Sequence, residues 1–335
     1  MPLIRPAPLK PPSADGEARL AQARFMEVPR AYPVRVRLSR AISRFGQRYC
    51  SERFEGIGWG LGKIAKRIMP YPSGPAVIPT TLGFSMLVDP CFDPVLETAL
   101  YYHGIYEEGT LHVMRKVLRP GDAFIDVGAN LGLMTLWAAR LIGASGHVHA
   151  FEPQPDTYAV LERHLAINAV RNVTVHRCAL GAQPGRRTLY ERSDVSRGAA
   201  SMVKPEKTFG QTTVELDTLD HLVETSQIGA VRMMKIDVEG WELEVLKGAR
   251  RLLAQRVAPV LCVESSRLCP VHEGGPADVY DFIRSVNDYR VYTLTRGKKR
   301  ISALQPVESA AGLPEHDNLF CFTPRHLQDL DGRLF

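Results

Sequence analysis

The chain has 335 residues, of which 45% are hydrophobic and 23% are charged, a composition typical of a globular protein with a substantial core. No apolar run approaches the roughly 20 residues that a membrane-spanning helix needs, and the N-terminal sequence lacks the apolar segment of a secretory signal. The six cysteines are scattered without a C-x-x-C pair, which argues against a zinc site or a disulfide framework, so we expect a reduced, cytoplasmic protein.

The positive charge is concentrated in residues 1–75, which hold 14 Lys or Arg and 5 Asp or Glu, a net charge of +9 against +6 for the whole chain. We expect residues 1–33, rich in Pro, Ala and Arg, to form a disordered tail. Residues 34–49 carry apolar side chains at helical spacing with arginines beside them, which predicts an amphipathic helix. Such a helix could pack on the main domain, contact a membrane surface or bind nucleic acid. We therefore divide the chain into a basic extension, 1–75, and one domain, 76–335.

The main domain is expected to begin with two short strands within residues 76–90, separated by a turn that contains glycine. A helix follows within residues 97–122. Its buried stripe is expected to contain Leu111, Met114, Val117 and Leu118, and the sequence R-P-G-D then ends it as a turn.

From Ala123 onward, apolar runs alternate with helical patterns. The predicted strands are residues 123–128, 146–153, 172–181, 230–240, 258–265, 289–302 and 318–324, and the predicted helices are residues 131–142, 156–168, 242–255 and 277–287. A longer irregular region precedes the strand at 230–240. Repeated strand–helix units predict an α/β fold with a parallel, doubly wound sheet.

Ligands of open α/β sheets bind at the carboxyl ends of the strands, so the residues that follow each strand are informative. Gly128 follows the first strand and permits a tight turn against a ligand, and the helix that begins near Leu131 directs its N-terminal amides there. Glu152 follows the second strand, where an acid accepts hydrogen bonds from ribose hydroxyls. These positions predict a nucleoside-containing cofactor.

The turn after the first strand favours S-adenosylmethionine (SAM) over a dinucleotide. The dinucleotide fingerprint G-x-G-x-x-G requires a glycine at position 130, where this chain has Asn130, whose side chain would crowd a pyrophosphate. Asp126, which closes the first strand, suits a ligand with a positive amine and a sulfonium. We therefore predict that Asp126 and its loop bind SAM.

The segments FIDVGANLG, VHAFEPQPDTYAVLERHLAIN, CALG and KIDVEGWELEVLKGA occur in an order and at a spacing that resembles the FkbM-type SAM-dependent methyltransferases, over about residues 76–325. The resemblance implies a class I methyltransferase (Rossmann-like) fold, with a seven-stranded, mostly parallel sheet, an antiparallel last strand and helices on both faces. Members of this family are mostly O-methyltransferases that act on hydroxyls of small molecules, polyketides or sugars, including bacterial glycans.

The resemblance also implies further residues of the cofactor site: Glu108, Thr110, Gly128, Ala129, Asn130, Glu152, Cys178 and Ala179. Residues 128–130 would surround the methionine part of SAM and Glu152 would hold the ribose. Residues 178–179 would flank the adenine, whereas Glu108 and Thr110 would reach the carboxylate or the amine.

Candidate catalytic acids lie at the ends of the fourth and fifth predicted strands: Asp237, Glu239 and Glu264. An alcohol must lose its proton during or after attack on the methyl group, and a carboxylate could accept that proton or orient the hydroxyl. Strand alternation places Asp237 and Glu239 on one side, with Val238 facing away, and the two acids would raise the pKa of one of them. Lys235 shares their side and could pair with an acid.

Three further interpretations concern individual polar residues near the ends of the strands. Asp237 and Glu264 occupy places where acids bind Mg²⁺ in related catechol O-methyltransferases, so a magnesium site is possible. His272 lies after the fifth strand, as a base or simply as an exposed side chain. Glu242 reads as a solvated first-turn acid that the helix dipole favours.

The predicted function is O-methylation of a hydroxyl on a sugar, a lipid-linked glycan or another small natural product, with the helix at 34–49 holding the protein near a membrane. The alternative is an RNA methyltransferase that uses the basic extension, although the chain has no N-P-P-[YF] tetrad and no Pro-Cys motif. A SAM-binding scaffold without activity is a third possibility.

Overall fold

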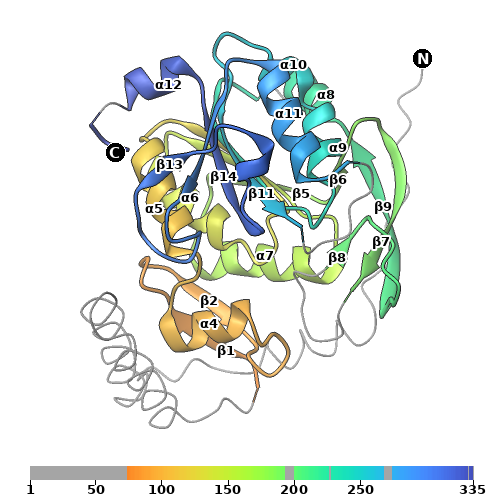
Figure 1. Ribbon diagram of the computed structural model, residues 1–335. Coiled ribbons are helices and arrows are strands. Elements are labelled where there is room, and N and C mark those ends of the chain that lie inside the picture. The colour runs from red at the N-terminus through yellow and green to blue at the C-terminus, as the bar shows by residue number, and fades with distance from the viewer. Residues whose placement is uncertain (1–73, 193–199, 226–227, 268–273, 331, 335) are drawn as a thin grey trace.

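The computed structural model describes residues 74–192, 200–225, 228–267, 274–330 and 332–334 (Figure 1). The predicted helix at 34–49 and His272 lie outside these ranges. Within them, every helix is too short or too polar to cross a membrane.

A mixed sheet of eight strands forms the centre of the domain. Its strands are β3 (Ala123–Val127), β4 (His147–Phe151), β5 (Val173–His176), β10 (Val231–Ile236), β11 (Val260–Ser266), β12 (Arg290–Leu294), β13 (Leu304–Pro306) and β14 (His316–Phe322). Their order is β13-β12-β14-β11-β10-β3-β4-β5. The five strands from β11 to β5 are parallel, and β14 is antiparallel to both of its neighbours. The predicted class I fold is confirmed, with β13 as an eighth, antiparallel edge strand.

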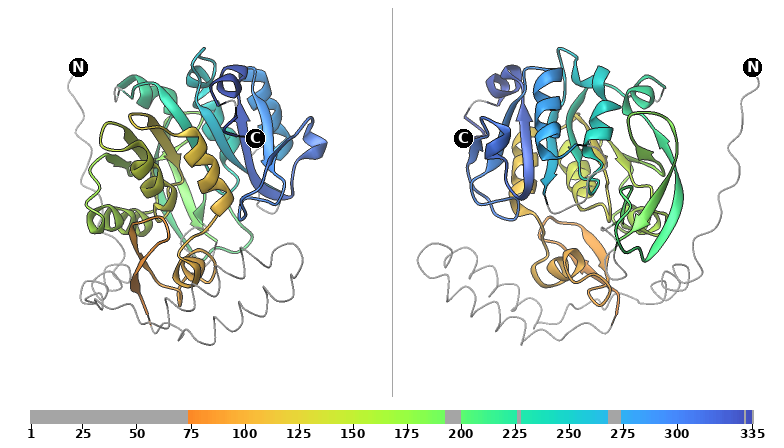
Figure 2. Two further views of the ribbon diagram at one scale, coloured as in Figure 1. Left: turned by 90° about the vertical axis from the view of Figure 1, so that its left-hand side faces the viewer. Right: turned by 45° about the vertical axis from the view of Figure 1, so that its right-hand side comes forward.

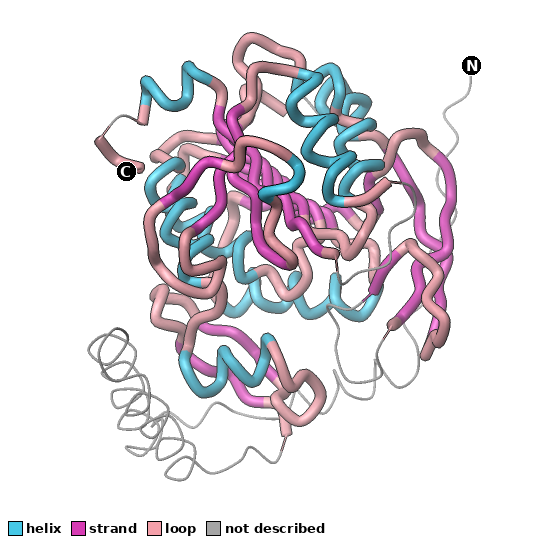
Figure 3. Tube along the Cα trace, in the orientation of Figure 1, coloured by secondary structure: helices cyan, strands magenta, loops and turns pink. Residues whose placement is uncertain are grey.

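Helices cover both faces of this sheet because successive strand residues point to opposite sides (Figure 3). Ile125 belongs to the core beneath α8 (Leu219–Thr225), α9 (Glu242–Lys247), α10 (Arg250–Leu253) and α11 (Pro276–Val286). Its neighbour Phe124 belongs to the opposite core, with α5 (Glu108–Val117) and α6 (Leu133–Ile142). Other helical elements of this part of the chain are α7 (Pro155–Ile167), α12 (Pro324–Asp329) and the 3₁₀ turn η2 (Ala310–Gly312).

A second sheet is formed by the region for which the sequence predicted no regular elements, and it lies beside the central sheet in Figure 2. Its strands are β6 (Ala179–Leu180), β7 (Gly185–Glu191), β8 (Ala200–Ser201) and β9 (Gly210–Asp217), in the order β6-β9-β7-β8. The predicted single strand at 172–181 is therefore wrong. The chain leaves the central sheet after His176, and β6 pairs with β9 instead.

The first elements form a small unit on α7, seen below the sheet in Figure 1. The predicted strands at 76–90 are confirmed as the hairpin β1 (Ala76–Pro79) and β2 (Ser85–Val88), and α4 (Leu96–His103) follows. The amide of Leu87 donates a hydrogen bond to Nε2 of His164, at 2.8 Å. The predicted stripe of α5 is buried, although Leu118 already has an extended backbone beyond the helix end.

The predicted helix at 242–255 is divided into α9 and α10 at Gly248. A Cβ atom at Gly248 would lie 1.9 Å from the carbonyl oxygen of Gly181. The backbone directly after β6 comes so close that only a glycine fits at position 248. A glycine also destabilises the interior of a helix, which explains why the helix is divided here.

Candidate active site

A cavity of about 360 Å³ lies at the edge of the sheet where β3, β4, β10 and β11 end. It brings together ten of the predicted site residues: Asp126, Gly128, Ala129, Asn130, Glu152, Cys178, Ala179, Asp237, Glu239 and Glu264. These residues are separated by up to 138 positions in the sequence, and the parallel strands collect them at one edge.

The loop after β3 is fixed by contacts with the ends of two other strands. Gly128 has a φ of +77° and Asn130 a φ of +50°. The amides of Gly128 and Ala129 both donate to the carbonyl oxygen of Phe151, at 3.0 Å. A Cβ atom at Gly128 would lie 1.9 Å from the carbonyl oxygen of Asp237, so this position accommodates only glycine.

Glu152 is held at the cavity wall by backbone amides. Its Oε2 accepts from the amide of Asn130 and its Oε1 from the amide of Gln154, both at 2.9 Å. Burial raises the pKa of this carboxyl group to about 7, although the two amides act in the opposite direction. Each oxygen retains a lone pair, so the carboxylate can accept two further hydrogen bonds, as a ribose diol would require.

Two buried acceptors near the cofactor loop lack partners among the described residues. Oδ2 of Asp126 accepts from the hydroxyl of Thr135 at 2.6 Å, but its Oδ1 has no hydrogen bond, and neither has Oδ1 of Asn130. Buried polar atoms are nearly always paired in native proteins. Unsatisfied acceptors beside a carboxylate fit a ligand that donates from an amine, so the site is compatible with SAM.

The wall beyond Glu152 is apolar. Cys178 and Ala179 line the cavity as predicted, together with Phe151 from β4, Leu189 from β7 and Met202 directly after β8. Burial raises the pKa of the Cys178 thiol to about 12, so it stays protonated and behaves as an apolar group. Leu189 and Met202 were missed because the sequence did not predict the second sheet.

Glu108 and Thr110 do not line the cavity, and Glu107 does. The backbone of Glu107 is left-handed, with a φ of +49°, which turns its side chain toward the site before α5 begins. Thr110 is fully buried and accepts a hydrogen bond from Nδ2 of Asn318 at 2.9 Å. Glu107, and not Glu108, therefore contributes the side chain that lines the cavity before α5.

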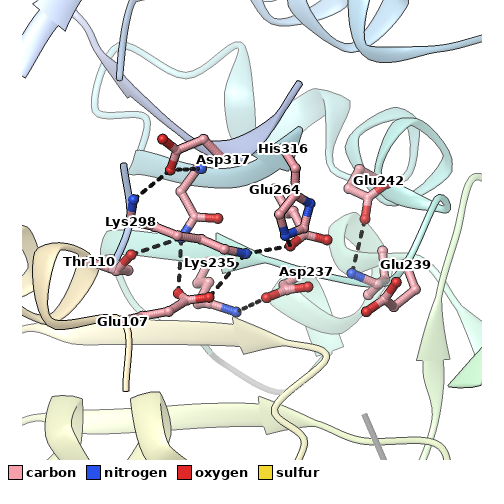
Figure 4. Close-up of polar contacts among 12 residues, drawn as sticks. Glu107, Thr110, Lys235, Asp237, Glu239, Glu242, Glu264, Lys298, His316 and Asp317 are labelled. Atoms are coloured by element: carbon pink, nitrogen blue, oxygen red, sulfur yellow. Dashed lines mark hydrogen bonds and ion pairs between the residues drawn. The ribbon is translucent and has the colours of Figure 1, made fainter. Parts of the chain in front are cut away.

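Two buried lysines organise the acids of the cavity (Figure 4). Nζ of Lys298 lies 3.0 Å from Oε1 of Glu107 and 2.6 Å from Oε1 of Glu264. Nζ of Lys235 lies 2.8 Å from Oδ2 of Asp237, which confirms the predicted pairing. Burial alone would raise the pKa of Asp237, but Lys235 and Lys298 lower it. Burial and the neighbouring Asp237 raise the pKa of Glu264.

The predicted alternation of Asp237, Val238 and Glu239 is wrong because β10 ends at Ile236. Glu239 has a φ of +54°, so the segment is a turn and no longer a strand. Val238 lines the cavity along with both acids. Oε2 of Glu239 lies 3.2 Å from Nη1 of Arg192, which reaches it from beyond β7.

Glu242 is a structural acid and not a solvated one. It is buried, and its carboxylate accepts from the amide of Val238 at 3.1 Å and from the amide of Gly240 at 3.1 and 3.2 Å. Its side chain points back at the turn in Figure 4. Glu242 thereby fixes the segment that carries Asp237 and Glu239.

Carboxylate oxygens of Asp237, Glu239 and Glu264 lie within 4.8 Å of one another, as in a metal site. Each of these acids, however, already faces a cation: Lys235, Arg192 and Lys298, respectively. Ammonium and guanidinium groups compete with a metal ion for the same oxygens. The arrangement argues against the magnesium alternative, and we assign no metal here.

Lys298 and His316 also line the cavity and were not predicted. Lys298 lies between β12 and β13, and His316 begins β14. The predicted catalytic acids all lie at or after the carboxyl ends of parallel strands. An antiparallel strand brings its first residues to that same edge, and this signal would have identified His316.

A family model described as the methyltransferase FkbM domain matches residues 126–291. The chain is 31% identical over 147 residues to the hexuronic acid methyltransferase AglP of Haloferax volcanii, covering 44% of this chain and 58% of AglP. It is 33% identical over 162 residues to the 31-O-demethyl-FK506 methyltransferase FkbM of Streptomyces tacrolimicus, covering 39% and 60%. The chain thus spans about three fifths of the length of these curated relatives.

Solved structures with similar folds include a SAM-dependent methyltransferase from Aquifex aeolicus, with a TM-score of 0.36, 14% identity and coverage of 69% of this chain and 93% of that one. Trm5b from Pyrococcus abyssi has a TM-score of 0.38 and 14% identity, with coverage of 76% and 56%. The class I assignment rests on the strand order described above.

Proposed function

The domain that contains residues 126–291 belongs to the FkbM methyltransferase family, and from this premise we propose that the chain transfers a methyl group from SAM to a hydroxyl of a sugar, a glycan or another small natural product. The observation that carries the proposal is the position of Glu152 and Asp126 in the same cavity as Asp237 and Glu264. One end of the cavity suits the cofactor, and the other end presents polar groups to an acceptor.

In this proposal the cofactor lies between the loop after β3 and the second sheet. The unpaired Oδ1 of Asp126 accepts from the amine, and Glu152 accepts from the ribose hydroxyls. Ala179 and Leu189 contact the adenine. When bound, SAM supplies a methyl group activated by the adjacent sulfonium.

The acceptor end then positions a hydroxyl for in-line attack, from which most of the rate enhancement of such a transfer comes. Asp237 and Glu239 are the proposed hydrogen-bond acceptors for the hydroxyl, and Glu264 completes this wall. Because Lys235 and Arg192 already hold the two carboxylates, little reorganisation is needed when the acceptor binds.

The acceptor class is supported by the names of the relatives. AglP is named for a hexuronic acid, a sugar derivative, and the Streptomyces tacrolimicus protein for the 31-O position of a natural product. Neither name refers to nucleic acid, so the RNA alternative gains no support from them. A cytoplasmic location and a membrane contact through residues 34–49 stay part of the proposal, and liposome binding would test the latter.

Calorimetric titration with S-adenosylhomocysteine (SAH) tests the cofactor assignment. We expect micromolar binding by the wild type, lost in Glu152→Ala and retained in Glu162→Ala, which removes an exposed acid of α7. Acceptors are then screened by SAH release from SAM with methyl glycosides of neutral hexoses, 6-deoxyhexoses and hexuronic acids. A wild type that fails to bind SAH would overturn the proposed function.

A further inference from the structure

His316 occupies the acceptor end of the cavity because β14 is antiparallel. In the register of β11 and β14, His316 pairs with Ser266 and Asn318 pairs with Glu264. The first residues of β14 therefore lie beside the last residues of β11, at the edge where the cavity opens. The side chain of His316 is 39% exposed and lines the cavity. Among the described residues, no other histidine lines this cavity.

The environment of His316 is built by charged groups from several elements. Nε2 of His316 lies 3.7 Å from Oε1 of Glu264, too long for a hydrogen bond but close enough for a charge interaction. Lys298 fixes that carboxyl oxygen at 2.6 Å. Figure 4 shows the imidazole beside Glu264, and above Asp237.

The three acids predicted to act in catalysis are poor bases in this arrangement. The ion pair with Lys235 lowers the pKa of Asp237, and Glu239 faces Arg192. Oε1 of Glu264 is bound by Nζ of Lys298 at 2.6 Å, so this acid too is engaged by a cation. These groups can orient a hydroxyl, but they have little capacity to take its proton.

His316 does have that capacity at neutral pH. Burial and Lys298 lower the pKa of His316 from its ordinary value, whereas Asp237 and Glu107 act in the opposite direction and Lys299 adds to the lowering. The net effect favours the neutral imidazole, the form that accepts a proton. Its partial exposure toward the cavity leaves it accessible to an acceptor, as a general base must be.

Resting on the function proposed above, we propose that His316 is the catalytic base that takes the proton of the acceptor hydroxyl. The hydroxyl oxygen attacks the methyl carbon, so that a C–O bond forms and the C–S bond breaks. The electron pair of the C–S bond stays on the sulfur of SAH. The hydroxyl proton moves to the His316 imidazole and leaves to solvent after product release, while Asp237 and Glu107 offset the positive charge in between.

The test compares His316→Gln and His316→Ala with His221→Gln, which removes an exposed histidine of α8 outside the cavity. SAH release is measured over pH 5–9 with the methyl glycoside that the wild type methylates fastest. We expect kcat to fall about 10²- to 10³-fold in both His316 variants, as for loss of a general base. SAH affinity should stay within about twofold of the wild type, and His221→Gln should be unaffected.

Two readouts separate a base from a structural residue. The wild type should lose kcat as the pH falls below the pKa of His316, and His316→Gln should lack this acid limb. Added imidazole should restore part of the rate of His316→Ala. A His316→Gln enzyme within threefold of the wild type, with the acid limb intact, would overturn the proposal. A wild type that binds SAH but methylates no glycoside would instead contradict the acceptor class on which both proposals depend.

Discussion

Gly128 lies against the carbonyl oxygen of Asp237, so closely that a Cβ atom would approach this oxygen to 1.9 Å. The loop proposed to bind the cofactor and the turn proposed to face the acceptor are therefore in direct backbone contact. This backbone contact fixes the distance between the proposed cofactor site and the proposed acceptor site, and no side chain takes part in it.

Gly128→Ala should therefore damage both stability and cofactor binding. The φ of +77° and the clash with Asp237 predict a loss of about 2–4 kcal/mol in the free energy of unfolding, measured by urea denaturation. Gly143→Ala is the matched control, because Gly143 has a φ of +67° but no heavy atom within 4 Å of its added Cβ. The control should lose about 1–3 kcal/mol, because Gly143 has a ψ of −174° and this backbone conformation is essentially restricted to glycine, but it should bind SAH normally. Equal behaviour of the two variants would contradict the close contact.

The affinity for SAH should depend on pH through Glu152. Burial raises the pKa of this carboxyl group to about 7, and only the carboxylate can accept from both ribose hydroxyls. The dissociation constant should therefore be about tenfold higher at pH 6 than at pH 8, where the group is already ionised. Glu152→Gln should bind more weakly at pH 8 and lose most of this dependence. Calorimetry at the two pH values measures both effects, and an unchanged dependence in Glu152→Gln would assign the titration to another group.

Glu242→Gln should loosen the turn at residues 238–240. An amide side chain retains one acceptor oxygen and turns an NH₂ group toward the amides of Val238 or Gly240, which the carboxylate now binds. We expect a loss of about 1–3 kcal/mol in the free energy of unfolding. Glu215→Gln is the control, since Glu215 is an exposed acid paired with exposed Arg186, and it should change stability by less than about 1 kcal/mol. Equal losses would show that Glu242 does not fix the turn.

The parts of the fold that could be predicted from the sequence are those with local signals. The strands at 123–128 and 258–265 are continuous apolar runs, and both are buried central strands of the sheet. Glu152 directly follows the strand β4, and it lines the cavity as expected from that position. The second sheet was missed because most residues of β7 and β9 are exposed or half-buried, and their strands carry no apolar run.

The parts of the site that escaped prediction depend on long-range contacts or on backbone conformation. Lys298 meets Glu107 across 191 positions, and no local pattern marks either residue as part of one cluster. Glu107 and Glu239 both have positive φ values, which are uncommon for residues other than glycine and which redirect their side chains. Arguments from strand or helix periodicity fail at such positions because the periodicity has already ended.

Lys298→Met should destabilise the protein strongly, because it leaves the buried Glu107 and Glu264 without their cation. All three side chains are at most 6% exposed. Breaking a buried ion pair from one side typically costs about 3–5 kcal/mol in the free energy of unfolding. Lys299→Met, at the exposed neighbouring position, should change stability by less than about 0.5 kcal/mol. Urea denaturation at pH 7 measures both variants, and a small effect at Lys298 would show that the two acids are neutral without it.

A row of half-buried histidines on β4 and β5 should make the fold sensitive to acid. Nδ1 of His149 lies 3.3 Å from Nε2 of His176, and the ring of His147 lies 4.8 Å from that of His149. Burial, followed by the charges of His147 and His176, lowers the pKa of His149 to about 4. As the pH falls through about 6.5, the unfolded chain binds protons before the folded protein does, so stability present above pH 6.5 is lost toward pH 4. The melting temperature should therefore fall less between pH 7 and pH 5 in His149→Gln than in the wild type or in the control His221→Gln. An equal fall in all three proteins would show that the acid sensitivity of the fold comes from other groups.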